Sequence, residues 1–173
     1  EEHIPGIPGD TFIGRHFENP DTNRVRLAKE FIKFSQRSFI RLLGDMRSYN
    51  YVVDMTPDFE AIQYRVRAID FDQQAFEGHL RMYLPQFFPE NERVVALCAE
   101  LLNYQAMTQY QDEERSLLKR RYNLSRDRLG VLFGLLDRES ISPPEKIAQL
   151  AGELGEFHGS DQFDGITTTG SLI

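Results

Sequence analysis

Two short segments of this 173-residue chain combine aromatic and β-branched residues in the way that strands do. The first is Tyr-Asn-Tyr-Val-Val at residues 49–53, and the second is residues 64–69, where apolar and polar side chains alternate. Between them the sequence Thr-Pro-Asp at residues 56–58 is a turn signal. The economical interpretation is one antiparallel β-hairpin.

Helical patterns surround this hairpin on both sides. Asp21 and Thr22 offer N-cap oxygens for a long helix over about residues 23–42, whose apolar residues recur largely at steps of three and four. We expect Gly44 to end it, because glycine tolerates left-handed geometry. Toward the C-terminus the periodicity predicts helices over residues 91–107, 112–122, 125–136 and 143–154. The predicted fold class is α+β, mostly helical, with a short β-hairpin.

Two flanking segments are expected to lie outside the folded domain. Residues 1–20 contain three prolines and three glycines, so we predict an extended lead-in with turns. Residues 156–173 are rich in glycine and threonine and predict a flexible tail. The domain itself is therefore expected over residues 21–155.

The charge and the cysteine content limit the classes of partner. A formal net charge of −7 argues against a nucleic-acid backbone or an anionic membrane as the main partner. Sixteen of the 20 basic residues are arginines, which still leaves room for a local basic patch. The only cysteine, Cys98, excludes an internal disulfide and fits a reducing compartment. The sequence has no apolar run of membrane-spanning length and no signal-peptide pattern, so we expect a cytoplasmic protein.

Three acids and an amide lie at the ends of the predicted strands. Asp45 precedes Asn50 by five residues at the start of the first strand, and Asp70 and Asp72 follow the second strand. Pairing of the two strands would bring these ends together. Phosphoryl transfer needs such a set, because a carboxylate must accept the proton of the nucleophile and oxygen ligands must hold Mg²⁺ against phosphate.

Residues 44–50 and 69–72 resemble two motifs of the protein-kinase-like superfamily, in its aminoglycoside-phosphotransferase and choline-kinase branch. Gly-Asp, four residues and then Asn resemble its catalytic loop, and Ile-Asp-Phe-Asp resembles its metal-binding motif. The resemblance implies that residues 21–155 form a helical, kinase-like C-terminal lobe. It also implies an ATP- and magnesium-dependent phosphotransferase with an unknown phosphate acceptor.

Each residue of the two motifs has an implied role. By the resemblance Asp45 is the catalytic base, Asn50 and Asp70 are metal ligands, and Asp72 assists the metal. Arg47 stands where the family often has Lys or His, so it is implied to contact the transferring phosphate. The alternative for Arg47 is an ion pair with a nearby acid. The alternative for the acids is that they bond backbone N–H groups and simply cap the hairpin.

The sequence departs from the family pattern in three respects. The span between Asn50 and Asp70 is longer than the usual hairpin connection, which implies an insertion around residues 54–63. Leu43 stands where the family usually has His. A glycine loop and a strand lysine of an N-terminal nucleotide-binding lobe are not visible, because Lys29 and Lys33 lie on the long predicted helix. The expected partners are therefore a nucleotide, a phosphate acceptor, and either a missing lobe or another protein. Two other classes stay open: a non-catalytic interaction or scaffold protein with a degenerate kinase-like lobe, and a metal-dependent hydrolase using the three acids.

Overall fold

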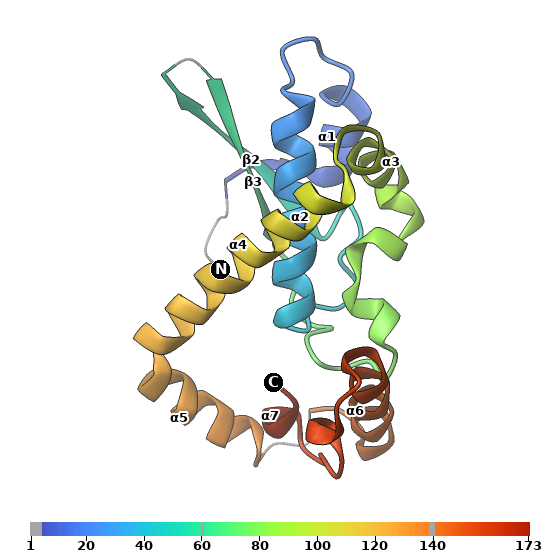
Figure 1. The fold of residues 1–173 in the computed structure, drawn as a ribbon, viewed down its shortest axis with the longest axis vertical. Helices are drawn as coiled ribbons and strands as arrows, with labels where there is room; N and C mark the ends of the chain where they lie inside the picture. The colour runs from blue at the N-terminus through green and yellow to red at the C-terminus, as the bar shows by residue number, and fades with distance from the viewer. Residues whose placement is uncertain (1–4, 60, 139–140) are drawn as a thin grey trace.

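The computed structural model describes residues 5–59, 61–138 and 141–173. Helices dominate, and one small antiparallel sheet lies beside the long helix α2 (Figure 1). The fold is thus α+β and mostly helical, as predicted. In chain order the elements are β1 (Ile7–Pro8), α1 (Gly9–Arg15), α2 (Arg24–Ile40), β2 (Tyr51–Asp58), β3 (Ala61–Ala68), the 3₁₀ turns η1 (Leu80–Tyr83), η2 (Pro85–Phe87) and η3 (Pro89–Asn91), α3 (Glu92–Leu101), α4 (Tyr104–Leu124), α5 (Arg126–Leu136), α6 (Pro144–His158), η4 (Asp161–Phe163) and α7 (Thr169–Leu172).

The predicted hairpin is confirmed, and it is longer than the two sequence segments. β2 and β3 pair in unbroken antiparallel register from Tyr51 opposite Ala68 to Asp58 opposite Ala61. The sheet has the order β1-β2-β3, so β1 adds a short third strand to the other edge of β2. The residues between the two predicted strands therefore extend the hairpin as a two-stranded ribbon.

The turn predicted at residues 56–58 is wrong, because these residues continue β2. The chain reverses just beyond them, where Phe59 has a φ of +37°. Within the described chain, β1 reaches along β2 only as far as Val53, so the outer edge of β2 is open beside Pro57. In this register the backbone nitrogen of Pro57 points away from β3 and toward the open edge. Proline has no N–H, but none is needed at this position for a hydrogen bond between β2 and β3.

Helix α2 carries one face of the main core. It corresponds to the helix predicted over residues 23–42, although it ends at Ile40. Its N-cap is Asn23, whose side chain accepts a hydrogen bond from the first turn at 3.0 Å, rather than Asp21 or Thr22. The buried face packs with the sheet, α1 and α3 through apolar residues that include Leu27, Ala28, Phe31 and Phe34.

The loop after α2 differs from the prediction at Gly44. Left-handed backbone occurs at Leu42 (φ +48°) and at Asp45 (φ +55°) instead. Glycine is needed at position 44 for a close approach, since a Cβ there would lie 2.5 Å from the backbone oxygen of Gln73. The backbone N–H of Ala75 also donates to the oxygen of Leu42 at 2.8 Å. The loop before the hairpin is therefore packed on the segment that follows it.

The N-terminal segment differs from the extended lead-in expected over residues 1–20. Residues 7–15 form β1 and helix α1. Phe12 and Ile13 of this helix are 1% and 8% exposed and belong to the main core. The burial of these apolar side chains outweighs the local effect of the neighbouring prolines and glycines.

The helical C-terminal part is confirmed, with different boundaries. The helix predicted over residues 91–107 breaks at Leu102, and Asn103 then caps α4 by accepting a hydrogen bond from its first turn at 2.8 Å. Helix α6 runs past its expected end and stops at Gly159, whose φ is +60°. The expected flexible tail contains η4 and α7, and Leu172 of α7 is buried.

Figure 1 shows how the helices are distributed. Helix α4 crosses α2 and leads away from the sheet to α5, while α6 and α7 lie at the end opposite the hairpin tip. A second apolar cluster joins α6 and α7 to η1. Within residues 5–59, 61–138 and 141–173, no helix is long and apolar enough to cross a membrane.

Candidate functional site at the base of the hairpin

The loop between α2 and β2 carries the predicted acid and amide. Asp45 adopts a left-handed backbone conformation, which Asp and Asn tolerate better than most other residues. Its backbone N–H donates to the oxygen of Met82 at 3.0 Å. Asn50 lies directly before β2 and is buried. The backbone of the loop therefore fixes both residues at the start of the hairpin.

Asn50 holds Asp45 through two contacts of its side-chain amide. The Nδ2 atom of Asn50 donates to the backbone oxygen of Asp45 at 2.7 Å and to its carboxylate Oδ2 at 3.2 Å. The backbone N–H of Asn50 also donates to the oxygen of Arg47 at 2.9 Å, which closes the loop. The side chain of Asp45 keeps 25% of its surface exposed. A buried amide thus orients a carboxylate that solvent can still reach, which is the arrangement required of a general base.

Arg47 bridges two carboxylates. Its Nε donates to Asp45 Oδ1 and its Nη1 donates to Glu90 Oε1, each at 2.7 Å. The guanidinium group lies 5.2 Å from the centre of the Phe88 ring. Hydrogen bonds to Asp45 and then to Glu90 raise the pKa of Arg47. The ion-pair interpretation of Arg47 is confirmed, whereas its contact with a phosphate stays a prediction.

The register of the hairpin brings the second acid to the same end. The backbone N–H of Ile69 donates to the oxygen of Asn50 at 3.0 Å, and Asp70 is the next residue. One carboxylate oxygen of Asp70 accepts from the backbone N–H of Asp72 at 3.2 Å, as the capping interpretation predicts for this acid. Among the described residues no hydrogen bond joins Asp70 to Asp45. The structure therefore links Asp45 to Asn50 directly, and Asn50 to Asp70 through the strand backbone.

The side-chain oxygens at the base of the hairpin could bind Mg²⁺ only together with ligands from a nucleotide and water. In the described parts of the chain, no three His, Cys, Asp or Glu side chains are grouped so that they could hold a metal ion by themselves. Magnesium bound with a nucleotide commonly takes only one or two carboxylates from the protein, and phosphate and water supply the rest. The amide oxygen of Asn50 and the carboxylate of Asp70 are oxygen donors of the kind that such an ion takes from a protein.

A buried amide that sequence reasoning missed supports the loop. Asn91 is 0% exposed, and its Nδ2 donates to the backbone oxygens of Met46 (2.9 Å) and Pro85 (2.8 Å). Its Oδ1 accepts from the hydroxyl of Tyr51 at 2.9 Å. Burial raises the pKa of that hydroxyl. The sequence signal was an Asn before a helix, which normally indicates a cap, but here the side chain ties the loop to the hairpin and to α3.

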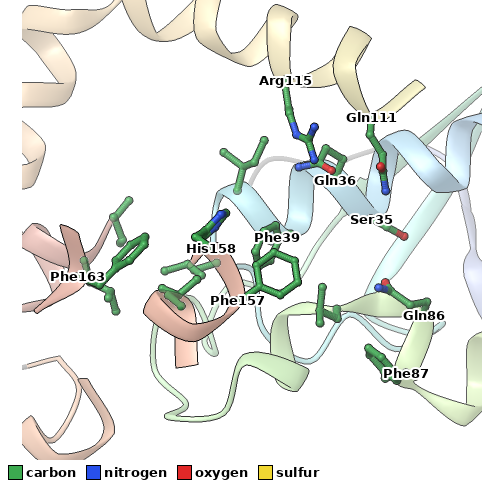
Figure 2. Close-up of a pocket in the computed structure, with 16 residues that line it drawn as sticks. Ser35, Gln36, Phe39, Gln86, Phe87, Gln111, Arg115, Phe157, His158 and Phe163 are labelled. Carbon is green, nitrogen blue, oxygen red and sulfur yellow. The ribbon is translucent and has the colours of Figure 1, made fainter. Parts of the chain in front are cut away.

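A separate hollow of about 940 Å³ lies between the end of α2, α4, α6 and the C-terminal segment (Figure 2). Aromatic rings line it: Phe39 packs on Phe157 with centroids 5.3 Å apart, and His158 stacks on Phe163 at 5.8 Å. The described residues that line this hollow do not include Asp45, Asn50, Asp70 or Asp72. The candidate site and this apolar hollow are therefore different features of the surface.

No protein-family model matches this chain, and neither a curated protein nor a solved structure matches it. The kinase-like resemblance therefore depends on the residues of the loop and of the hairpin alone.

Proposed function

We propose that this chain carries the catalytic-loop half of a phosphoryl-transfer site, with Asp45 as the general base. The observation that supports it most is the Asn50 side chain, which bonds both the backbone and the carboxylate of Asp45 at the end of the hairpin where Asp70 follows β3. Catalysis of phosphoryl transfer is mostly positioning and charge stabilisation. The hydrogen bonds of the loop supply the positioning of one carboxylate.

In this proposal Asp45 accepts the proton of an acceptor hydroxyl. Its Oδ1 is engaged by Arg47 at 2.7 Å, whereas Oδ2 has only the longer 3.2 Å bond to Asn50. The more weakly bound Oδ2 is therefore the atom that takes the proton. Arg47 is a positioning residue that also offers positive charge near the transferred phosphate.

The proposed cofactors are Mg²⁺ and ATP. Asn50 and Asp70 would hold the ion, with Asp72 beside them. When bound, Mg²⁺ would neutralise negative charge on the phosphate oxygens. Asp70 must give up its 3.2 Å bond to the backbone of Asp72, or share it, to take part.

The lysines of α2 do not supply the phosphate clamp in this proposal. Lys33 pairs with Glu113 at 2.7 Å, and Lys29 lies 5.1 Å from the centre of the Tyr110 ring. Both therefore serve the contact between α2 and α4. We propose that the second side of a nucleotide cleft comes from another lobe or from a protein partner.

Paramagnetic NMR tests the proposal even for weak binding. Titration of the ¹⁵N-labelled protein with Mn²⁺ and a non-hydrolysable ATP analogue should broaden the amide signals of Asn50 and Asp70 first. Asp70→Asn should weaken this binding by at least about 10-fold, because even the loss of a group that only orients a metal ligand has an effect of that size. Asp127→Asn removes the same charge from the exposed surface of α5 and is the matched control. Broadening that is absent at millimolar ligand, or equal in both variants, contradicts the proposal.

A non-catalytic interaction protein is the second candidate, and helix α5 favours it. The helix buries none of its residues, although Val131, Leu132 and Leu135 are apolar and exposed. Exposed contiguous apolar surface is typical of protein interfaces. This candidate predicts concentration-dependent association in sedimentation velocity that Leu132→Glu abolishes and Asp70→Asn does not. A monomer at every concentration would count against self-association through α5.

A further inference from the structure

A hollow of about 480 Å³ lies between the second half of α2, β3 and the end of α4. Five arginines line it, although the chain as a whole has a net charge of −7. They come from three parts of the fold: Arg37 from α2 and Arg41 from the residue after it, Arg65 and Arg67 from β3, and Arg121 from α4. We call this hollow the arginine pocket.

Two buried carboxylates balance the charge of the deeper arginines. The side chain of Arg37 is 8% exposed, with Nη2 at 2.6 Å from Glu30 and Nη1 at 3.1 Å from Glu114. Nη2 also donates to the backbone oxygen of Val66 at 3.0 Å. Arg65 lies 3.8 Å from the same Glu30 oxygen. Glu30 and Glu114, which lie behind the pocket lining, therefore offset the charge of Arg37 and, for Glu30, part of that of Arg65.

On the exposed side of the pocket, carboxylates do not balance the positive charge of all the arginines. Arg67 pairs with Asp54 at 2.9 Å. No carboxylate oxygen of the described residues lies within 4.0 Å of the guanidinium of Arg41 or of Arg121. Burial, and then repulsion from Arg37 and Arg121, lowers the pKa of Arg41. Two guanidinium groups thus face the pocket without an anion, and they repel each other.

Two buried polar atoms of the pocket residues also lack a hydrogen-bond partner among the described residues. They are the hydroxyl of Ser38 and the Nη1 atom of Arg37, which is close to Glu114 but not aligned for a hydrogen bond. Most buried polar groups in proteins are satisfied, and a ligand can provide the missing partner. Because Nη1 of Arg37 already faces Glu114, the hydroxyl of Ser38 is the atom that indicates, independently of the charge, that the pocket accepts a hydrogen-bonding group.

We propose that the arginine pocket binds a small molecule that carries two or more phosphate groups. Guanidinium groups pair with phosphate oxygens through two parallel hydrogen bonds. The volume suits a small ligand, since such sites measure about 300–1,000 Å³. Phe71 lies beside the pocket, 44% exposed and 6.0 Å from Arg41, and can cover an apolar or aromatic part of the ligand. A long polyanion is less suited, because the chain is acidic overall.

Calorimetric titration with pyrophosphate tests this assignment. The buffer contains EDTA, so that a magnesium site plays no part. The variants Arg41→Gln and Arg121→Gln change exposed side chains, and Arg120→Gln changes the neighbouring exposed arginine of α4, which does not line the pocket. Pyrophosphate should bind the wild type saturably. Each of the two pocket variants should weaken it by about tenfold or more, the effect of one lost charge-assisted hydrogen bond, while Arg120→Gln should leave it unchanged.

Other outcomes overturn the assignment. The first is a wild type that does not bind pyrophosphate saturably, and the second is a loss in Arg120→Gln equal to that in Arg121→Gln. A third is tighter binding of single-stranded DNA than of pyrophosphate, because the surface would then serve a polymer. The pocket does not depend on the proposed phosphoryl transfer, because Asp45, Asn50 and Asp70 are not among the described residues that line it.

Discussion

Replacement of Asn91 by alanine should remove much of the stability of this protein. The side chain is fully buried and makes three hydrogen bonds, to the backbone oxygens of Met46 and Pro85 and from the hydroxyl of Tyr51. Alanine leaves the backbone oxygen of Met46 and the hydroxyl of Tyr51 without a partner, whereas the oxygen of Pro85 keeps its bond from the backbone N–H of Phe88 at 3.3 Å. At about 1–2 kcal/mol for each of these two groups, the free energy of unfolding should fall by about 2–4 kcal/mol.

Urea unfolding followed by circular dichroism measures this loss. Asn103→Ala is the control, because it removes an exposed helix cap and should cost only about 1 kcal/mol. Tyr51→Phe removes one of the three hydrogen bonds. The double variant should therefore lose less free energy of unfolding than the two single variants lose together. If Asn91→Ala costs no more than the control, or if the two effects are fully additive, the bonds contribute no net stability and the reasoning is refuted.

Three further predictions concern buried features. Gly44→Ala places a methyl group 2.5 Å from a backbone oxygen and should cost about 1–3 kcal/mol in urea unfolding; an unchanged midpoint would show that the loop can move aside. Arg37→Met leaves the buried carboxylate of Glu114 without a cation and Glu30 with only Arg65 at 3.8 Å, and a thermal melt should show a loss of about 3–5 kcal/mol; a gain would show that burying the ions is the larger effect. Burial raises the pKa of Cys98 to about 12, so a disulfide reagent at pH 8 should modify it only after unfolding, and rapid native-state modification would disagree.

The hairpin and the position of its acids could be predicted because both follow from local rules. Aromatic and β-branched residues identify the strands, and alternation in the second strand identifies its inner face. Val53 and Val66 are paired and buried accordingly, at 3% and 2% exposure. The contact between Asn50 and the residue before Asp70 then follows from the register alone.

The features that escaped prediction are set by contacts between distant segments. Gly44 resembles a helix stop in sequence, yet a glycine is required there because the backbone of Gln73 leaves no room for a side chain. Asn91 resembles a helix cap, yet its partners lie on the loop and on the hairpin. The sequence allowed a basic patch, but it could not show that Arg121 meets the arginines of α2 and β3. Periodicity reports which face of an element is buried and not which element covers it.

The open edge of β2 carries two features that oppose pairing with a strand of another molecule. Beyond Val53 the described chain provides no neighbour on that side, and an unpaired edge can recruit a strand from another molecule. Pro57 removes an outward amide hydrogen there, and Asp58 adds a negative charge beside it, whereas the charge of Asp54 is paired with Arg67 at 2.9 Å. An incoming strand would find a gap in the hydrogen-bond ladder and electrostatic repulsion. The proline that looked like a turn in the sequence is therefore a safeguard against edge-to-edge aggregation.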